Sequence, residues 1–138
     1  MSIEENKDLV RRWIENLNKQ NWAAISEFLA SNFIGHNPER EIHREDMKES
    51  FTRFYKAFPD YLWTIDDMVA EGDRVAVRMT GLGTHKGEYA GAAPTGKQVK
   101  LADIGIFRIT GGKIVEDWAQ RDIMGFLQQL GVIPTRSQ

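Results

Sequence analysis

Cysteine is absent from the 138 residues of this sequence, so disulfides, thiol nucleophiles and cysteine-based metal sites are excluded. Positive charge is not in excess either: 18 Lys and Arg residues stand against 20 Asp and Glu residues, for a formal net charge of −2. A surface that binds nucleic-acid phosphates needs clustered Lys and Arg. We therefore expect no nucleic-acid partner.

Long hydrophobic runs are missing as well. No apolar stretch approaches the roughly 20 residues that cross a bilayer, so we expect no membrane partner. The N-terminal segment MSIEENKDLVRRW is polar and has no apolar core of the kind found in signal peptides, which favours a cytoplasmic protein. The metal-binding patterns HxH and HExxH are also absent, and we predict no metal site.

The sequence does have enough apolar residues for a core, at 41%. A chain of this length fits one domain, which we expect to span residues 1–138 because no repeat, low-complexity tract or linker divides it.

Three helical segments come first. Ser2 and Glu5 have the spacing of a capping box, and apolar residues at helical intervals predict a helix over residues 3–19. Asn21 is placed to cap a second helix. A third is predicted over residues 43–58, where Pro59 ends it.

The remainder is mainly predicted strand. A short extended piece at 33–36 precedes the third helix, and longer strands are predicted over the ranges 62–70, 75–84, 99–109 and 114–121. A last helix over 122–130 ends at Gly131. Helices followed by an antiparallel meander indicate an α+β fold.

The strand at 114–121 has no clean polar face. Counted by the period of two, Glu116, Trp118 and Asp122 share a side with Ile114, so carboxylates and apolar residues are mixed. A strongly curved sheet closed by helices on one side would explain this, because its concave face needs apolar walls with a few polar groups. Under this hypothesis all three line a pocket. The alternative is an edge strand with solvated charges.

Asp122 has the strongest case for chemistry. A carboxylate beside Trp118 in a partly dry cavity would have its pKa raised by desolvation, as a general acid or base requires. It also stands at the start of a helix, where the commonest role of an Asp is that of an N-cap. His36 and His85 end short apolar stretches and are placed to point into one pocket mouth; the alternative for each is a hydrogen-bonded or exposed histidine.

Aromatic side chains gather around the end of the third helix. Tyr55, Phe58, Tyr61 and Trp63 form this cluster. Such clusters are usually core, and some form the wall against which a planar ligand stacks.

Three segments together resemble the SnoaL-like polyketide cyclases, also called the ester cyclase family. They are GTHKGEYAGAAPTGKQV, IFRITGGKIVEDW and RDIMGFLQQLG, and the resemblance covers nearly the whole chain. It implies a cone-shaped α+β barrel of the nuclear-transport-factor-2-like kind, in which a curved, mainly antiparallel sheet packs against N-terminal helices and encloses a pocket.

The resemblance also implies cofactor-independent ring closure by intramolecular aldol chemistry on a small, polyketide-like carbonyl substrate. Asp122 matches the family's general acid/base, His36 and His85 match polar pocket positions, and Glu116 and Trp118 match pocket lining. The expected ligand is a hydrophobic or aromatic carbonyl compound, with Tyr55, Phe58 and Trp63 contributing to its binding. A binding protein without turnover, or an isomerase, dehydratase or hydrolase using the same pocket, remains an alternative, because one fold hosts many functions.

A curved sheet also has an outer face that the helices cannot cover. An apolar face of this kind is seldom left in water, so we predict a homodimer through the sheets, as the resemblance also implies. Val115 and Ala119 are expected in the interface, with Asp117 and Arg121 in it or at its rim. One further apolar set is expected there, the one that faces away from the helices: either Val75, Val77 and Met79, or Ile104 and Ile106.

Overall fold

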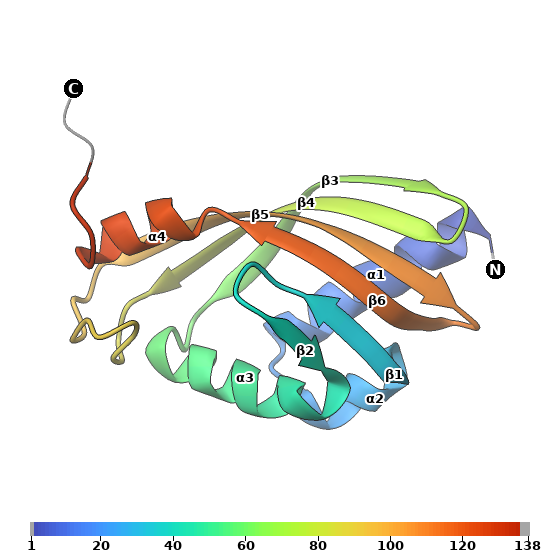
Figure 1. The fold of residues 1–138 in the computed structure, drawn as a ribbon, viewed down its shortest axis with the longest axis horizontal. Helices are drawn as coiled ribbons and strands as arrows, with labels where there is room; N and C mark the ends of the chain where they lie inside the picture. The colour runs from blue at the N-terminus through green and yellow to red at the C-terminus, as the bar shows by residue number, and fades with distance from the viewer. Residues whose placement is uncertain (1, 136–138) are drawn as a thin grey trace.

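One curved sheet of six strands dominates the computed structural model, which describes residues 2–135. The strands follow the order β2-β1-β6-β5-β4-β3, and neighbours are antiparallel except for the parallel pair β1 and β6. Their bounds are β1 Leu29–His36, β2 Glu41–His43, β3 Leu62–Glu71, β4 Arg74–Thr84, β5 Gln98–Thr110 and β6 Lys113–Arg121. The sheet is open, with β2 and β3 as its edges, and it arches over the helices (Figure 1).

Two long helices lie under this arch, α1 (Ile3–Asn18) and α3 (Arg44–Ala57) (Figure 1). The predicted capping box of α1 is confirmed: the Glu5 N–H donates to Ser2 Oγ at 3.1 Å, and the Ser2 N–H donates to Glu5 Oε1 at 3.1 Å. The bounds of both helices agree with the prediction to within one residue. Their apolar faces pack on the concave side of the sheet and form the main core.

The second predicted helix is broken. A 3-10 helix (Trp22–Ala24) runs into a single turn of α-helix, α2 (Ile25–Phe28), and Leu29 already belongs to β1. The predicted cap is wrong, since the Asn21 side chain makes no capping hydrogen bond. Strand β2 was not predicted, because three residues are too few to reveal an alternation.

A bulge at Val115 decides which side chains of β6 face the helices. Ile114 pairs with Ile109, but the next pair is Glu116 with Arg108, so β6 contains one residue more than β5 at this point. A bulge of this kind moves every later side chain to the opposite face.

The prediction for β6 was therefore out of phase. Ile114 lies in the core, as expected, but beyond the bulge it is Asp117, Ala119 and Arg121 that turn toward the helices. The same reversal removes all three from the outer face, where the sequence placed them. Ile104 and Ile106 are the apolar set that faces outward, with exposed fractions of 56% and 37%.

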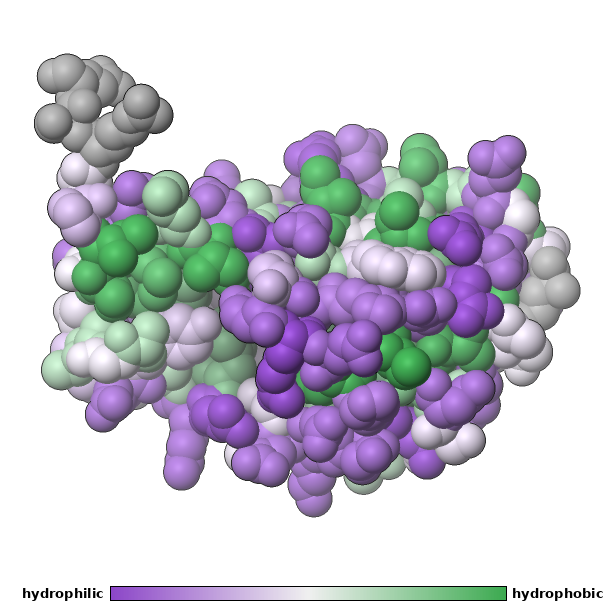
Figure 2. Space-filling model, viewed as in Figure 1, coloured by the Kyte–Doolittle hydropathy of each residue, from purple (hydrophilic) through white to green (hydrophobic). Residues whose placement is uncertain are grey.

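Helix α4 (Ile123–Leu130) continues directly from β6 and lies at one end of the arch (Figure 1). Gly131 ends it in the left-handed conformation, at φ 79°, as the sequence predicted. Figure 2 shows a largely apolar surface at this end of the molecule. Within residues 2–135, no helix has both the length and the apolar character needed to cross a membrane.

Candidate active site

A cavity of about 190 Å³ lies between the concave face of the sheet and the helices. Its walls are mainly aromatic and aliphatic, and its floor carries three charged side chains from the central strands β5 and β6. The aromatic lining consists of Trp13, Phe51, Phe54, Tyr55, Trp63, Tyr89, Phe107 and Phe126. The charged floor consists of Asp103, Asp117 and Arg121. Apolar walls with a few convergent polar groups are typical of small-molecule sites.

Asp117 places a carboxylate in apolar surroundings. Its Oδ1 is shielded from solvent and has no hydrogen-bond partner within residues 2–135. Burial raises the pKa of Asp117 to about 7; Arg121 opposes this rise and Asp103 adds to it. A carboxyl group in this state exchanges a proton readily at neutral pH, which suits a general acid or base.

Gly35 on β1 makes room for this carboxylate. It pairs with Asp117 across the parallel strands, and a Cβ atom at Gly35 would lie 2.9 Å from Asp117 Oδ1 and 2.8 Å from Ile42 Cγ2. Any larger residue at this position would displace either the Asp117 carboxyl group or the Ile42 side chain.

Asp103 and Arg121 form a buried ion pair two rows away on the same face. They are directly opposite each other on β5 and β6, and Arg121 Nε donates to Asp103 Oδ2 at 3.0 Å. Asp103 is 3% exposed, and its Oδ1 has no hydrogen-bond partner in the part of the chain that the structure describes. Burial raises the pKa of Asp103, although Arg121 lowers it. Among the described residues Arg121 donates through Nε alone, which leaves its two terminal nitrogens for a ligand.

Asp122, the predicted acid/base, does not line the cavity. Its Oδ1 accepts a hydrogen bond from the Gly125 N–H at 2.9 Å and caps the first turn of α4. The capping role that the sequence also suggested is confirmed. The pocket position is wrong because the bulge reverses the phase of β6.

His85 and Phe58 lie in the core next to the cavity rather than in its wall. The two rings stack with centroids 5.4 Å apart, and each residue is 0% exposed. His85 Nδ1 accepts from the Thr95 N–H at 3.2 Å, so this histidine fastens the loop that joins β4 to β5. Neither side chain is among those that meet the cavity.

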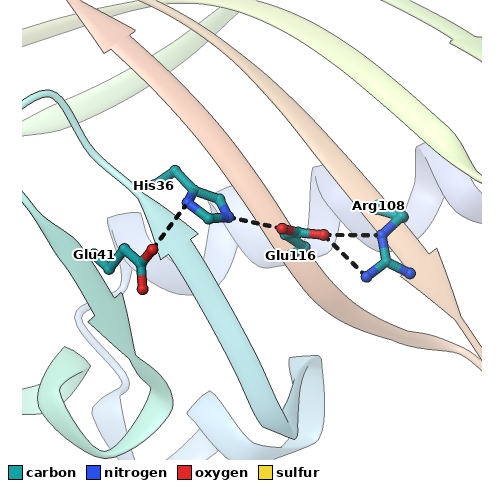
Figure 3. Close-up of polar contacts among 4 residues, drawn as sticks. All are labelled: His36, Glu41, Arg108 and Glu116. Atoms are coloured by element: carbon teal, nitrogen blue, oxygen red, sulfur yellow. Dashed lines mark hydrogen bonds and ion pairs between the residues drawn. The ribbon is translucent and has the colours of Figure 1, made fainter.

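His36 and Glu116 lie together on the outer face of the sheet (Figure 3). His36 Nε2 is 2.7 Å from Glu116 Oε2, and Arg108 donates to the other carboxylate oxygen from Nε at 3.1 Å and Nη2 at 3.0 Å. Glu41 Oε1 is 3.9 Å from His36 Nδ1. The hydrogen bond from His36, followed by that from Arg108, lowers the pKa of Glu116. The prediction that these two residues line the pocket is wrong.

Three predicted binding residues do meet the cavity: Tyr55, Trp63 and Trp118. Tyr55 Oη donates to the Leu17 carbonyl at 3.3 Å, and burial raises the pKa of Tyr55 to about 12. The Trp118 ring itself lies on the outer face, where it stacks on His36 at 5.4 Å and lies under Arg74 at 5.2 Å. Trp118 therefore meets the cavity through its main chain, whose carbonyl oxygen would lie 3.2 Å from a Cβ atom at Gly105.

Sequence reasoning missed the three charged residues of the floor as site residues. Asp103 carried a usable signal, because it shares the phase of Leu101 and Phe107 and so places a carboxylate on an apolar strand face. Asp117 and Arg121 carried none, since only the paired structure reveals the bulge before them.

Several solved structures share the fold of this chain. No curated protein matches the sequence. Among solved structures, AclR from Streptomyces galilaeus, a proposed hydroxylase, is 30% identical with a TM-score of 0.90, over 99% of this chain and 87% of AclR. IdmH from Streptomyces antibioticus, a proposed polyketide cyclase, is 29% identical with a TM-score of 0.83, over 91% and 98%. TsrD from Streptomyces laurentii is 26% identical with a TM-score of 0.85, over 96% and 99%.

The family comparison covers most of the chain. Residues 7–130 match the family described as SnoaL-like polyketide cyclase, a span that contains the whole cavity floor and all six strands. The curved α+β architecture and the sequence match therefore lead to the same conclusion, that this chain belongs to the SnoaL-like polyketide cyclase family.

Proposed function

We propose that this protein is a cyclase-type enzyme in which Asp117 removes a proton from the carbon next to a substrate carbonyl. The observation that carries the proposal is a carboxylate at the floor of a mainly apolar cavity, with a pKa of about 7 and a buried Oδ1 that none of the described residues hydrogen-bonds. A general base works best when its pKa lies near the working pH.

Arg121 is the group that stabilises the resulting charge. When the substrate C–H bond breaks, the proton goes to the Asp117 carboxylate and the electron pair moves onto the carbonyl oxygen as an enolate. The Arg121 guanidinium is held by Asp103 and already oriented, so it stabilises that oxygen without rearranging. The enolate carbon then bonds to a second carbonyl carbon of the same substrate, and the new alkoxide takes up the proton that Asp117 removed, which restores the carboxylate.

Asp103 positions the guanidinium and balances part of its charge. Its Oδ2 accepts from Nε, and among the described residues the terminal nitrogens of Arg121 make no hydrogen bond. The side chains named here supply the base, the cation and its support, so the proposed scheme uses no cofactor. Its substrate is a small hydrophobic or aromatic carbonyl compound.

Deuterium exchange tests the assignment of the base. Methyl acetoacetate is incubated in deuterated buffer, and exchange at its α carbon is followed by NMR against a sample without enzyme. We expect Asp117→Asn to reduce the enzyme-dependent rate about a hundredfold or more. Asp122→Asn is the matched control, because it removes the carboxylate that follows β6 and should keep the rate near that of the wild type. Binding without wild-type exchange would instead identify a binding protein.

We also propose a homodimer through the outer face of the sheet. Ile104 and Ile106 are exposed there in the centre of β5, and Leu82 is 43% exposed on β4. A second copy presenting the same face would bury this apolar area. The interface differs from the one expected from the sequence, because Ala119, Asp117 and Arg121 belong to the cavity.

A further inference from the structure

The cavity floor contains a row of small residues between its two charged rows. Gly105 on β5 is directly opposite Ala119 on β6. On one side of this row is the pair Asp103 and Arg121, and on the other side is Phe107, which pairs with Asp117. Successive rows on one face are two residues apart, or about 7 Å.

Among the described residues, no helix atom lies within 4 Å of a Cβ atom placed at Gly105. A Cβ atom there would meet the Trp118 carbonyl oxygen at 3.2 Å and the Phe107 ring at 4.0 Å, both of which belong to the sheet itself. Gly105 and Ala119 both line the cavity, while Phe51, Phe54 and Trp63 line it from α3 and β3. The small row is therefore the floor of a space whose other walls are aromatic.

The volume of this space limits what it encloses. An engineered apolar cavity of about 150 Å³ in another protein binds benzene, and one water occupies about 30 Å³ of liquid. A cavity of about 190 Å³ accordingly holds one six-membered ring with one or two small substituents such as carbonyl oxygens. The second ring of a fused system would lie outside this volume.

We infer that Gly105 and Ala119 are specificity-determining residues. They admit a β-dicarbonyl substrate of which the part inside the cavity is one flat ring, or an open chain of the same size. In that position the ring lies on the small row, with its acidic carbon toward Asp117 and a carbonyl oxygen toward Arg121. The inference rests on the proposed function for the reaction, but the size limit follows from the cavity alone.

Three β-keto esters with the same reacting group test the size limit. They are methyl acetoacetate, which has no ring, the methyl ester of oxocyclohexanecarboxylic acid, which has one, and the methyl ester of the corresponding tetralone carboxylic acid, which has two fused rings. Binding is measured by tryptophan fluorescence and turnover by deuterium exchange. In the wild type we expect the two-ring ester to bind and react at least about tenfold less well than the one-ring ester.

Ala119→Val and Gly105→Ala narrow the floor. Gly105→Ala adds one carbon and Ala119→Val adds two, and we expect each to weaken binding of the one-ring ester by about tenfold or more, and to affect methyl acetoacetate much less. Ala76→Val is the matched control, because it makes the same change on the outer face, where Ala76 pairs with Ile106.

The outcomes separate this inference from the proposed function. If the wild type binds the one-ring ester selectively but exchanges no probe, the proposed reaction is wrong and the size limit holds. If the two-ring ester binds as well as the one-ring ester, the inference is overturned. It is also overturned if Ala119→Val affects all three esters equally, or no more than Ala76→Val does.

Discussion

Replacing Asp117 by Asn should stabilise the fold at alkaline pH while it abolishes activity. The pKa of this carboxyl group rises from 3.8 to about 7 on folding. Each pKa unit corresponds to 1.36 kcal/mol, so ionising the buried group costs up to about 4 kcal/mol of folding free energy. The folded state binds the proton more tightly than the unfolded state does. The stability that the protonated carboxyl group provides is therefore fully present below about pH 4, and it is lost as the pH rises through the folded-state pKa of about 7.

Urea unfolding at a series of pH values between about 4 and 8 measures this effect. We expect Asp117→Asn and the wild type to have similar free energies of unfolding at the acid end, and the variant to be more stable by up to about 4 kcal/mol at the alkaline end. Tyr55→Phe is the control: it removes a cavity hydroxyl whose pKa is about 12, so it adds no charge change in this range. Parallel curves for Asp117→Asn and the wild type would refute the reasoning.

Three further changes have defined outcomes. Asp122→Ala should cost about 1 kcal/mol of stability in thermal unfolding, because it removes an N-cap, and should leave deuterium exchange intact. A loss of exchange would show that Asp122 takes part in the reaction. Gly35→Ala should slow exchange and cost about 1–3 kcal/mol, since its Cβ would crowd Asp117 Oδ1 and Ile42; an unchanged rate would show that the carboxyl group does not need this space. Ile104→Lys should convert a dimer mass in light scattering to that of one chain; a wild-type monomer at micromolar concentration would exclude the proposed interface.

The parts of the fold that the sequence predicts well are those set by neighbouring residues. The Ser2–Glu5 capping box and the helical spacing of Leu9, Val10 and Trp13 define α1 within one residue. Gly111 and Gly112, which separate the predicted strands at 99–109 and 114–121, have the positive φ values, 58° and 77°, that the hairpin between β5 and β6 requires.

The site was predicted less well because it depends on pairing between distant strands. The extra residue at Val115 is visible only once β6 is aligned with β5, and it exchanges the pocket face for the outer face. Ile104 and Arg108 share a strand face with Ile106, yet nothing local says which face the helices will cover. The parallel contact of β1 with β6, which brings Gly35 beside Asp117, joins residues 82 positions apart (117 − 35).

The dependence of exchange on pH tests the central claim most directly. If Asp117 is the base, the wild-type rate constant for enzyme-dependent exchange of methyl acetoacetate should rise with pH and level off above a midpoint near the pKa of about 7. The Asp117→Asn variant should show no such rise, and Asp122→Asn should reproduce the wild-type curve. A wild-type midpoint near 4, the usual range of an Asp carboxyl, or the same curve in Asp117→Asn, would contradict the account.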